Sequence, residues 1–190
     1  MKSNKKLPLF CITGTSGVGK STLLKVLSEK DNTNYIALEG DLLWNEVYNT
    51  PDDGYMSYRK LWLNMCDNIT QQIGMPVVLC GCNMLPEQFE KLAERQAFSE
   101  IHYMALVCDE ETITSRIEAR IKDGGTIHDI PYIYDKGWIK NWIKDAVEEN
   151  KWLIGNAETT TPKIHLFDTT KMTPEEAANI VDTWILERIL

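Results

Sequence analysis

The residues with the clearest chemical potential form one glycine-rich segment near the amino terminus. Gly14-Thr15-Ser16-Gly17-Val18-Gly19-Lys20-Ser21-Thr22 matches the pattern G-x-x-x-x-G-K-[ST] at every fixed position. In this pattern the glycines let backbone N–H groups approach phosphate oxygens, the lysine reaches the β- and γ-phosphates, and the hydroxyl after it ligates Mg²⁺. We therefore predict a site for magnesium and a nucleoside triphosphate, namely ATP, with Lys20 on the phosphates and Ser21 on the metal.

Two carboxylates, Glu39 and Asp41, follow a short apolar run that we predict to be a strand. A carboxylate at such a place can accept the proton of an acceptor hydroxyl or orient that hydroxyl for in-line attack on a phosphoryl group. Ligand sites cluster at the carboxyl ends of parallel strands, which favours this role for Asp41. The alternative for Asp41 is to cap a helix that starts at Leu42. The alternative for Glu39 is to face solvent at the strand end.

Two arginines, Arg116 and Arg120, are four residues apart and so share one face of a predicted helix. That helix leads into a loop with Gly124-Gly125. Arginine matches the geometry of phosphate groups, so the pair is a candidate phosphate ligand, and the alternative is a solvated face that pairs with glutamates. Arg59 and Arg95 are weaker candidates for the acceptor site, with surface charge as the alternative.

The segments that must position these side chains alternate between short apolar runs and longer helical patterns. Strands are predicted over residues 7–13, 35–38, 76–80, 101–108 and 163–167. Helices are predicted over residues 20–30, 41–48, 55–73, 86–98, 110–121, 134–153 and 174–189. Strands separated by helices need crossover connections, so the pattern indicates an α/β fold with a parallel sheet covered on both faces. The whole chain, 1–190, is predicted to be one domain with a short lid at about 122–134.

Composition excludes several classes of protein. The net charge of −8 disfavours broad binding to a nucleic acid backbone, so a nucleic acid partner is not expected. No run approaches the roughly 18 apolar residues of a membrane helix, and no signal-peptide pattern is present, so we expect no membrane partner. The five cysteines include Cys11, Cys80 and Cys108 in predicted buried strands. Free thiols in a core are typical of a reducing compartment, which predicts a cytoplasmic protein.

With these motifs in place, the chain resembles the small P-loop kinases, the group that contains gluconate, shikimate, adenylate and nucleoside kinases and chloramphenicol phosphotransferase. The resemblance covers nearly the whole chain and includes a late loop at Asp168-Thr169. It implies a three-layer P-loop fold with strand order 2-3-1-4-5 and phosphoryl transfer from ATP to a small acceptor. It also implies that Arg116 and Arg120 stabilise the transferring phosphoryl group as the lid closes, and that the loop at Asp168 and Thr169 passes the adenine.

The chain departs from the common P-loop pattern at the end of the third predicted strand. Many P-loop proteins have an aspartate there that holds Mg²⁺ through water, whereas this chain has Cys80-Gly81-Cys82-Asn83. Either Asp41 or Glu39 then completes the magnesium shell, or Mg²⁺ is held mainly by Ser21, phosphates and water.

We therefore predict an ATP-dependent phosphotransferase that acts on a small hydroxyl- or phosphate-bearing acceptor. The missing carboxylate keeps open an ATP-binding protein without transfer activity. A polynucleotide 5′-kinase is disfavoured by the charge, and a GTPase lacks the N-K-x-D guanine motif. Sugar acids, nucleosides, nucleotides and antibiotic-like alcohols all remain possible acceptors.

Overall fold

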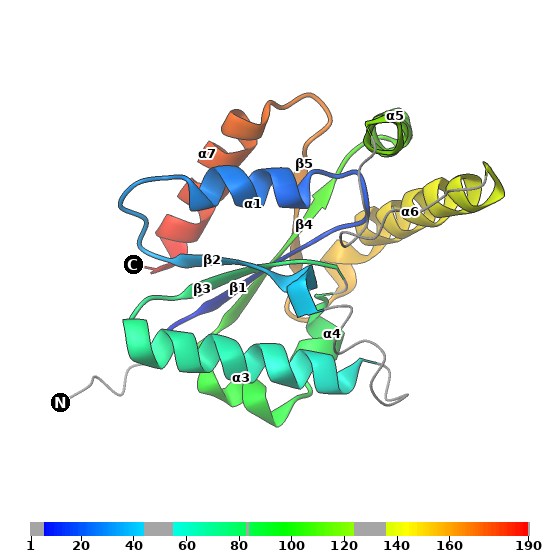
Figure 1. Ribbon diagram of the computed structural model, residues 1–190. Helices are drawn as coiled ribbons and strands as arrows, with labels where there is room; N and C mark the ends of the chain where they lie inside the picture. Colours follow the sequence, from blue (N-terminus) through cyan, green and yellow to red (C-terminus); the bar gives the residue numbers. More distant parts are fainter. Residues whose placement is uncertain (1–5, 44–54, 83, 124–135, 190) are drawn as a thin grey trace.

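The computed structural model describes residues 6–43, 55–82, 84–123 and 136–189, and a five-stranded parallel sheet forms the centre of this part of the chain (Figure 1). The strands are β1 (Leu9–Thr13), β2 (Ile36–Glu39), β3 (Val77–Cys80), β4 (Ile101–Val107) and β5 (Ile164–Asp168). They are ordered β2-β3-β1-β4-β5 across the sheet, and every neighbouring pair is parallel. The predicted fold class and strand order are confirmed.

The central strand β1 sends alternate side chains into two cores on opposite faces of the sheet. Phe10 and Ile12 enter one core, and Leu9 and Cys11 enter the other. All four side chains are fully buried. A parallel strand covered on both faces has no polar side, which is why its sequence is a continuous apolar run rather than an alternating one.

Helices cover both faces of the sheet (Figure 1). The first core is closed by α1 (Lys20–Ser28), α5 (Glu110–Lys122) and α7 (Pro174–Ile189). The second core is closed by α3 (Met56–Ile73) and the short α4 (Pro86–Phe89). The long helix α6 (Lys136–Asn156) contributes Val147 to the first core and Leu153 to the second. Short 3₁₀ turns complete the described part: η1 (Gly40–Leu43), η2 (Ala93–Ala97) and η3 (Ala157–Thr159).

Local side chains fix the start of the two helices that border the site. At α7 the Glu176 N–H donates to Thr173 Oγ1 over 3.2 Å, and the Thr173 N–H donates to a Glu176 carboxylate oxygen over 2.9 Å. This reciprocal pair is the capping box typical of the sequence pattern at this helix start. At α5 the Thr112 N–H donates to Asp109 Oδ1 over 2.7 Å. Both helices therefore begin at defined residues on the carboxyl side of the sheet.

The predicted helix over residues 86–98 is wrong, because the structure divides this segment into α4 and η2. Leu92 between them is extended, with φ −82° and ψ 140°. Phe89, Leu92 and Phe98 all enter the same core. In one continuous helix Phe98 would lie nine residues, or about 900°, after Phe89 and would point to the opposite side. The break at Leu92 allows both aromatic rings to be buried together.

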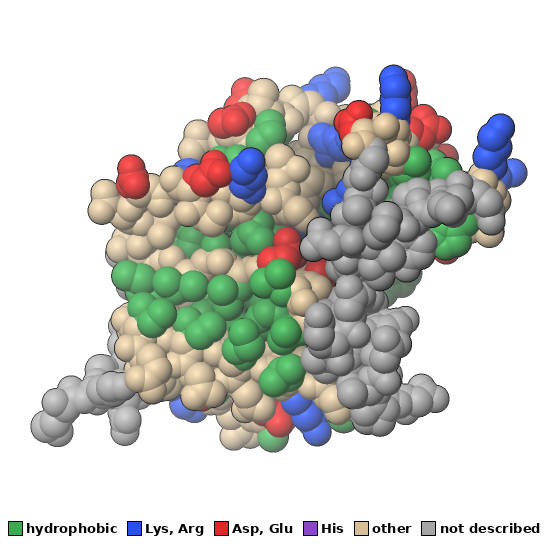
Figure 2. All heavy atoms as spheres, viewed as in Figure 1, with side chains coloured by type: hydrophobic (Ala, Val, Ile, Leu, Met, Phe, Trp, Pro, Cys, Tyr) green, Lys and Arg blue, Asp and Glu red, His purple; other side chains and the backbone are tan. Residues whose placement is uncertain are grey.

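Apolar side chains also form a band on the surface beside β2 and α3 (Figure 2). Tyr58 and Trp62 on α3 are buried against the sheet, whereas Leu61, Met65 and Ile73 on the same helix are exposed. Leu61 and Met65 are four residues apart and therefore neighbours on the helix surface, and Ile73 lies about two turns further along. Helix α3 thus has an apolar outer side in addition to its core side.

Some predicted segments fall outside the described residues. The predicted helix over 41–48 begins as the 3₁₀ turn η1, and residues 44–54 are not described. The predicted lid overlaps residues 124–135, which are also not described, so the lid and the single-domain organisation stay predictions. Among the described helices, none has the length and apolar character needed to cross a membrane.

Candidate active site

The glycine-rich loop connects the end of β1 to the start of α1, as the motif requires. Gly14 has φ +144° and Gly19 has φ +100°, a range that side chains rarely permit. A Cβ atom at Gly14 would lie 2.6 Å from the Leu106 carbonyl oxygen. These glycines let the loop turn tightly over the sheet and leave its N–H groups at the amino end of α1, where the helix dipole favours an anion. The loop has the form of a phosphate cradle.

Lys20 lies in the first turn of α1 with its side chain buried. Its ammonium donates to the carbonyl oxygens of Gly14, over 2.7 Å, and Thr15, over 3.0 Å. Burial alone would lower the pKa of Lys20, but the neighbouring Cys82 and Asp41 groups outweigh it, so the pKa is raised. A charged ammonium is thus held inside the loop, at the position expected for a phosphate ligand.

Two carboxylates at the end of β2 face this lysine. Glu39 is half-buried and lies beside Ser21 and Lys20. Burial, and then the Asp41 carboxylate, raise the pKa of Glu39, while Lys20 and Ser21 partly offset this effect. Asp41 Oδ1 accepts from the Cys82 N–H over 3.0 Å. Asp41 therefore uses its side chain to join the ends of β2 and β3, which does not fit the alternative of a helix cap at Leu42.

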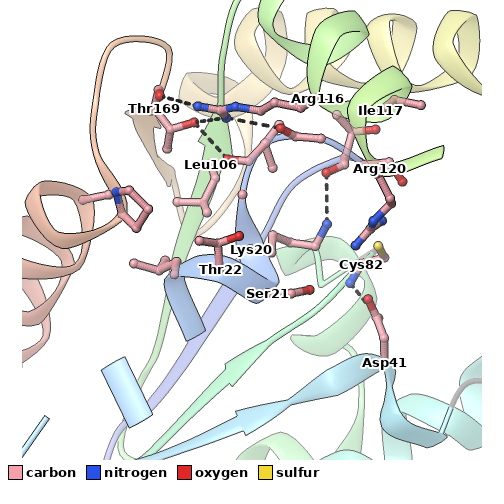
Figure 3. Close-up of a pocket in the computed structure, with 18 of the residues that line it drawn as sticks. Lys20, Ser21, Thr22, Asp41, Cys82, Leu106, Arg116, Ile117, Arg120 and Thr169 are labelled. Carbon is pink, nitrogen blue, oxygen red and sulfur yellow. Dashed lines mark hydrogen bonds between the residues drawn. The ribbon is translucent and has the colours of Figure 1, made fainter. Parts of the chain in front are cut away.

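The two arginines on α5 occupy different positions. Arg116 donates to the Gly17 carbonyl over 3.2 Å and to the hydroxyl and carbonyl oxygens of Thr169 over 3.3 and 3.1 Å. It thus ties the glycine-rich loop to the segment after β5. Arg120 is exposed, and its guanidinium points toward the space beside Lys20 and Cys82 (Figure 3). Arg120 is therefore the arginine on the Lys20 side of the site.

A cavity of about 970 Å³ joins these groups, at the upper end of the range of roughly 300–1,000 Å³ for small-molecule sites (Figure 3). It extends from the start of α7, past the glycine-rich loop, to the ends of β2 and β3. The residues along its wall include Thr15, Ser16, Gly17, Val18, Gly19, Lys20, Ser21, Thr22, Glu39, Asp41, Cys82, Arg116, Arg120, Thr169, Met172, Thr173 and Pro174. One continuous space thus connects nearly all the predicted site residues.

Three candidates from the sequence lie elsewhere among the described residues. Asp168 is exposed, and its carboxylate accepts from the Thr170 N–H over 2.8 Å, whereas the adjacent Thr169 is buried and borders the cavity. Arg95 pairs with Glu90 over 2.7 Å on the α4 side of the sheet. Arg59 is buried on α3 and does not line the cavity described above.

Sequence reasoning gave no role to Cys82, although it borders the cavity beside Lys20 and Asp41. A single cysteine between a glycine and an asparagine, Gly81 and Asn83, matches no functional motif. The only available signal was its place immediately after a strand next to the glycine-rich loop, where ligand sites cluster.

The parallel sheet, the loop after its central strand and the lysine within that loop define a P-loop protein. The sequence profile of the AAA domain family matches residues 11–136, more than half of the 190-residue chain. The chain belongs to this AAA domain family.

Solved structures with the same fold include several small-molecule kinases. A sugar kinase from Janibacter sp. HTCC2649 is 14% identical with a TM-score of 0.59, and the match covers 95% of each chain. A gluconokinase from Sinorhizobium meliloti 1021 is 15% identical with a TM-score of 0.59 over 97% of this chain and 95% of that one. Shikimate kinase from Acinetobacter baumannii, in complex with shikimate, is 15% identical with a TM-score of 0.56 over 97% and 96%. The resemblance to the small-molecule P-loop kinases is confirmed at the level of the fold.

Proposed function

We propose that the protein is an ATP-dependent phosphotransferase that moves the γ-phosphoryl group of ATP to a hydroxyl of a small acceptor. The observation that carries this proposal is the presence of Lys20 and Asp41 in one cavity, on either side of Cys82 (Figure 3). Lys20 belongs to the phosphate cradle, and Asp41 lies beyond it at the end of β2. A phosphoryl donor and a hydroxyl acceptor have separate ligands in this arrangement.

Each side chain has a defined part in the proposed transfer. Lys20 and the N–H groups of residues 14–22 bind the triphosphate, and Asp41 orients the acceptor hydroxyl and takes its proton. The acceptor oxygen forms a bond to the γ-phosphorus while the bond from that phosphorus to the β–γ bridging oxygen breaks. ADP is the leaving group. Arg120 stabilises the negative charge on the transferring group.

The residues present fit a magnesium ion bound together with the nucleotide. Ser21 and Glu39 supply hard oxygen ligands of the kind Mg²⁺ prefers, and the nearby Asp41 adds negative charge. Within the described ranges no group of three or more His, Cys, Asp or Glu side chains forms a complete metal site. On the basis of this oxygen chemistry we assign Glu39 to the magnesium shell, with Ser21 and phosphate oxygens as further ligands. When bound, the metal neutralises charge on the phosphates.

Arg116 has a different part from Arg120 in this proposal. Its guanidinium already holds Gly17 and Thr169, near the α7 end of the cavity. We assign it to the nucleotide side, where it fixes the loop against Thr169. The base of ATP would lie between this pair and the start of α7.

Incubation of the protein with MgATP and single acceptors tests the proposed function. The set contains sugars, sugar acids, nucleosides, nucleotides, aminoglycoside-like alcohols and a 5′-hydroxyl oligonucleotide. We expect one small-molecule class to raise ADP release well above the rate without acceptor. Binding of MgATP with no stimulation by any acceptor would instead support the ATP-binding protein without transfer activity. Stimulation by the oligonucleotide alone would support the polynucleotide kinase.

Glu39→Gln tests the proposed magnesium shell. Loss of even an outer-shell partner of a bound metal typically lowers metal affinity by about 10–100-fold, and loss of a direct ligand such as Glu39 should cost at least this much. We expect a decrease of this size in the affinity for Mg²⁺, measured by titrating Mg²⁺ into the complex of protein and ADP by calorimetry. ADP affinity without Mg²⁺ should change little. Glu29→Gln, an exposed position at the end of α1, is the matched control. Unchanged Mg²⁺ affinity in Glu39→Gln would mean that Ser21, phosphates and water hold the metal.

A further inference from the structure

Cys82 lies between the Lys20 side and the Asp41 side of the cavity (Figure 3). Its N–H donates to Asp41 Oδ1 over 3.0 Å, and its side chain borders the same cavity as Lys20, whose charge partly offsets the rise that burial causes in the pKa of the thiol. Figure 3 shows Cys82 between these two side chains, with Arg120 pointing into the same space. Cys82 is therefore next to the place where a phosphoryl group on Lys20 and a hydroxyl on Asp41 would meet.

The turn that carries Cys82 is fixed to the central strand and to the end of β2. The Gly81 N–H donates to the Ile12 carbonyl over 3.0 Å, and the Met84 N–H donates to Thr13 Oγ1 over 3.3 Å. A Cβ atom at Gly81 would lie 3.0 Å from Asp41 Oδ1 and 3.1 Å from Gly40 Cα. The ends of β2 and β3 are thus in direct contact at Gly81 and Gly40.

The Cys82 side chain is suited to be an uncharged part of the cavity wall between the Lys20 ammonium and the Asp41 carboxylate. Burial raises its pKa to about 11, an effect that Lys20 partly offsets, so the thiol is uncharged at neutral pH. An uncharged group does not compete with phosphate for Lys20, as a carboxylate at this position would. The other four cysteines (Cys11, Cys66, Cys80 and Cys108) are buried, so Cys82 is the cysteine that borders the cavity.

We propose that Cys82 is a positioning residue that sets the separation between the phosphoryl group at Lys20 and the acceptor hydroxyl at Asp41. This inference rests on the proposed transfer function. The backbone N–H orients the Asp41 carboxylate, and the side chain forms a wall that both substrates share. A larger, branched side chain displaces the groups that meet there, whereas serine, of nearly the same size, preserves the wall.

Binding of MgADP with and without aluminium fluoride tests this role before the acceptor is known. Aluminium fluoride imitates the transferring phosphoryl group, and transition-state analogues bind at least about 100-fold more tightly than ground-state ligands. We expect wild-type protein to bind MgADP more tightly by such a factor when aluminium fluoride is added. A displacement of the reacting groups by about 1 Å lowers the reaction rate by on the order of 100-fold. Cys82→Val should therefore lose most of the increase in MgADP affinity that aluminium fluoride produces.

Two comparisons separate positioning from a general structural effect. Cys82→Val should bind plain MgADP within about twofold of wild type, since the nucleotide ligands are untouched, and Cys82→Ser should retain the aluminium fluoride effect. If Cys82→Val keeps the full increase, or loses plain MgADP binding to the same extent, Cys82 does not position the transfer. If wild-type protein shows no increase at all, the proposed transfer function fails and this role fails with it.

Discussion

Lys20→Ala is expected to lower the affinity for MgADP by about 100-fold or more while the fold stays intact. The wild-type ammonium is buried within the phosphate cradle, and each charge-assisted hydrogen bond that it makes to a phosphate contributes about 1.5–3 kcal/mol. Two such bonds correspond to at least two powers of ten in affinity. The side chain contacts the loop carbonyls of Gly14 and Thr15 rather than the cores, so its loss leaves the packing of the sheet unchanged.

Calorimetric titration of MgADP measures this effect, and thermal unfolding of the same samples checks the fold. Lys25→Ala is the matched control, because Lys25 is exposed on the same helix and should bind MgADP like wild type. Equal MgADP affinities in wild type and Lys20→Ala would contradict the assignment of residues 14–22 as the nucleotide loop.

Asp41→Asn is expected to lower turnover by about 10²–10⁴-fold, the usual contribution of a general base, with MgATP binding nearly unchanged. Asparagine has almost the same shape, and its side-chain oxygen can still accept the hydrogen bond from the Cys82 N–H. The substitution therefore removes the proton acceptor and the charge but not the contact between β2 and β3. Turnover is measured as ADP release with the acceptor that stimulates the wild-type protein.

Asp31→Asn provides the control for this change, since Asp31 is exposed in the segment between α1 and β2. A collapse of MgATP binding in Asp41→Asn would show that Asp41, rather than Glu39, completes the magnesium shell. If neither turnover nor binding changes, Asp41 only joins the ends of two strands.

The features that could be predicted from sequence are those encoded by neighbouring residues. The apolar run of β1 and the glycine-rich loop after it both reflect local requirements: burial on two faces and a tight turn around phosphate. The capping box at Thr173 and Glu176 is equally local. The order of the strands followed from the resemblance that these motifs supported.

The features that could not be predicted depend on residues far apart in the sequence. Cys82 and Asp41 are 41 residues apart, and they meet only because Gly40 and Gly81 let the ends of β2 and β3 touch. Arg116 reaches Thr169 because β4 and β5 are neighbours in the sheet. The break at Leu92 depends on the burial of Phe89 and Phe98 in the same core. Such contacts leave no periodic pattern in the sequence.

The two hydrogen bonds from Lys20 to the loop carbonyls have a consequence for ligand discrimination. The ammonium has three N–H donors, and two of them are used on these carbonyls at 2.7 and 3.0 Å, so a ligand that takes more than one hydrogen bond from Lys20 must displace a carbonyl. Binding of a phosphate in the loop thus involves exchange of internal hydrogen bonds for hydrogen bonds to the ligand. We expect a free nucleoside to leave the lysine where it is, because it brings no phosphate oxygens, whereas a polyphosphate chain presents oxygens from two neighbouring groups at once. The hydrogen bonds between Lys20 and the loop carbonyls therefore favour ligands that have a polyphosphate chain.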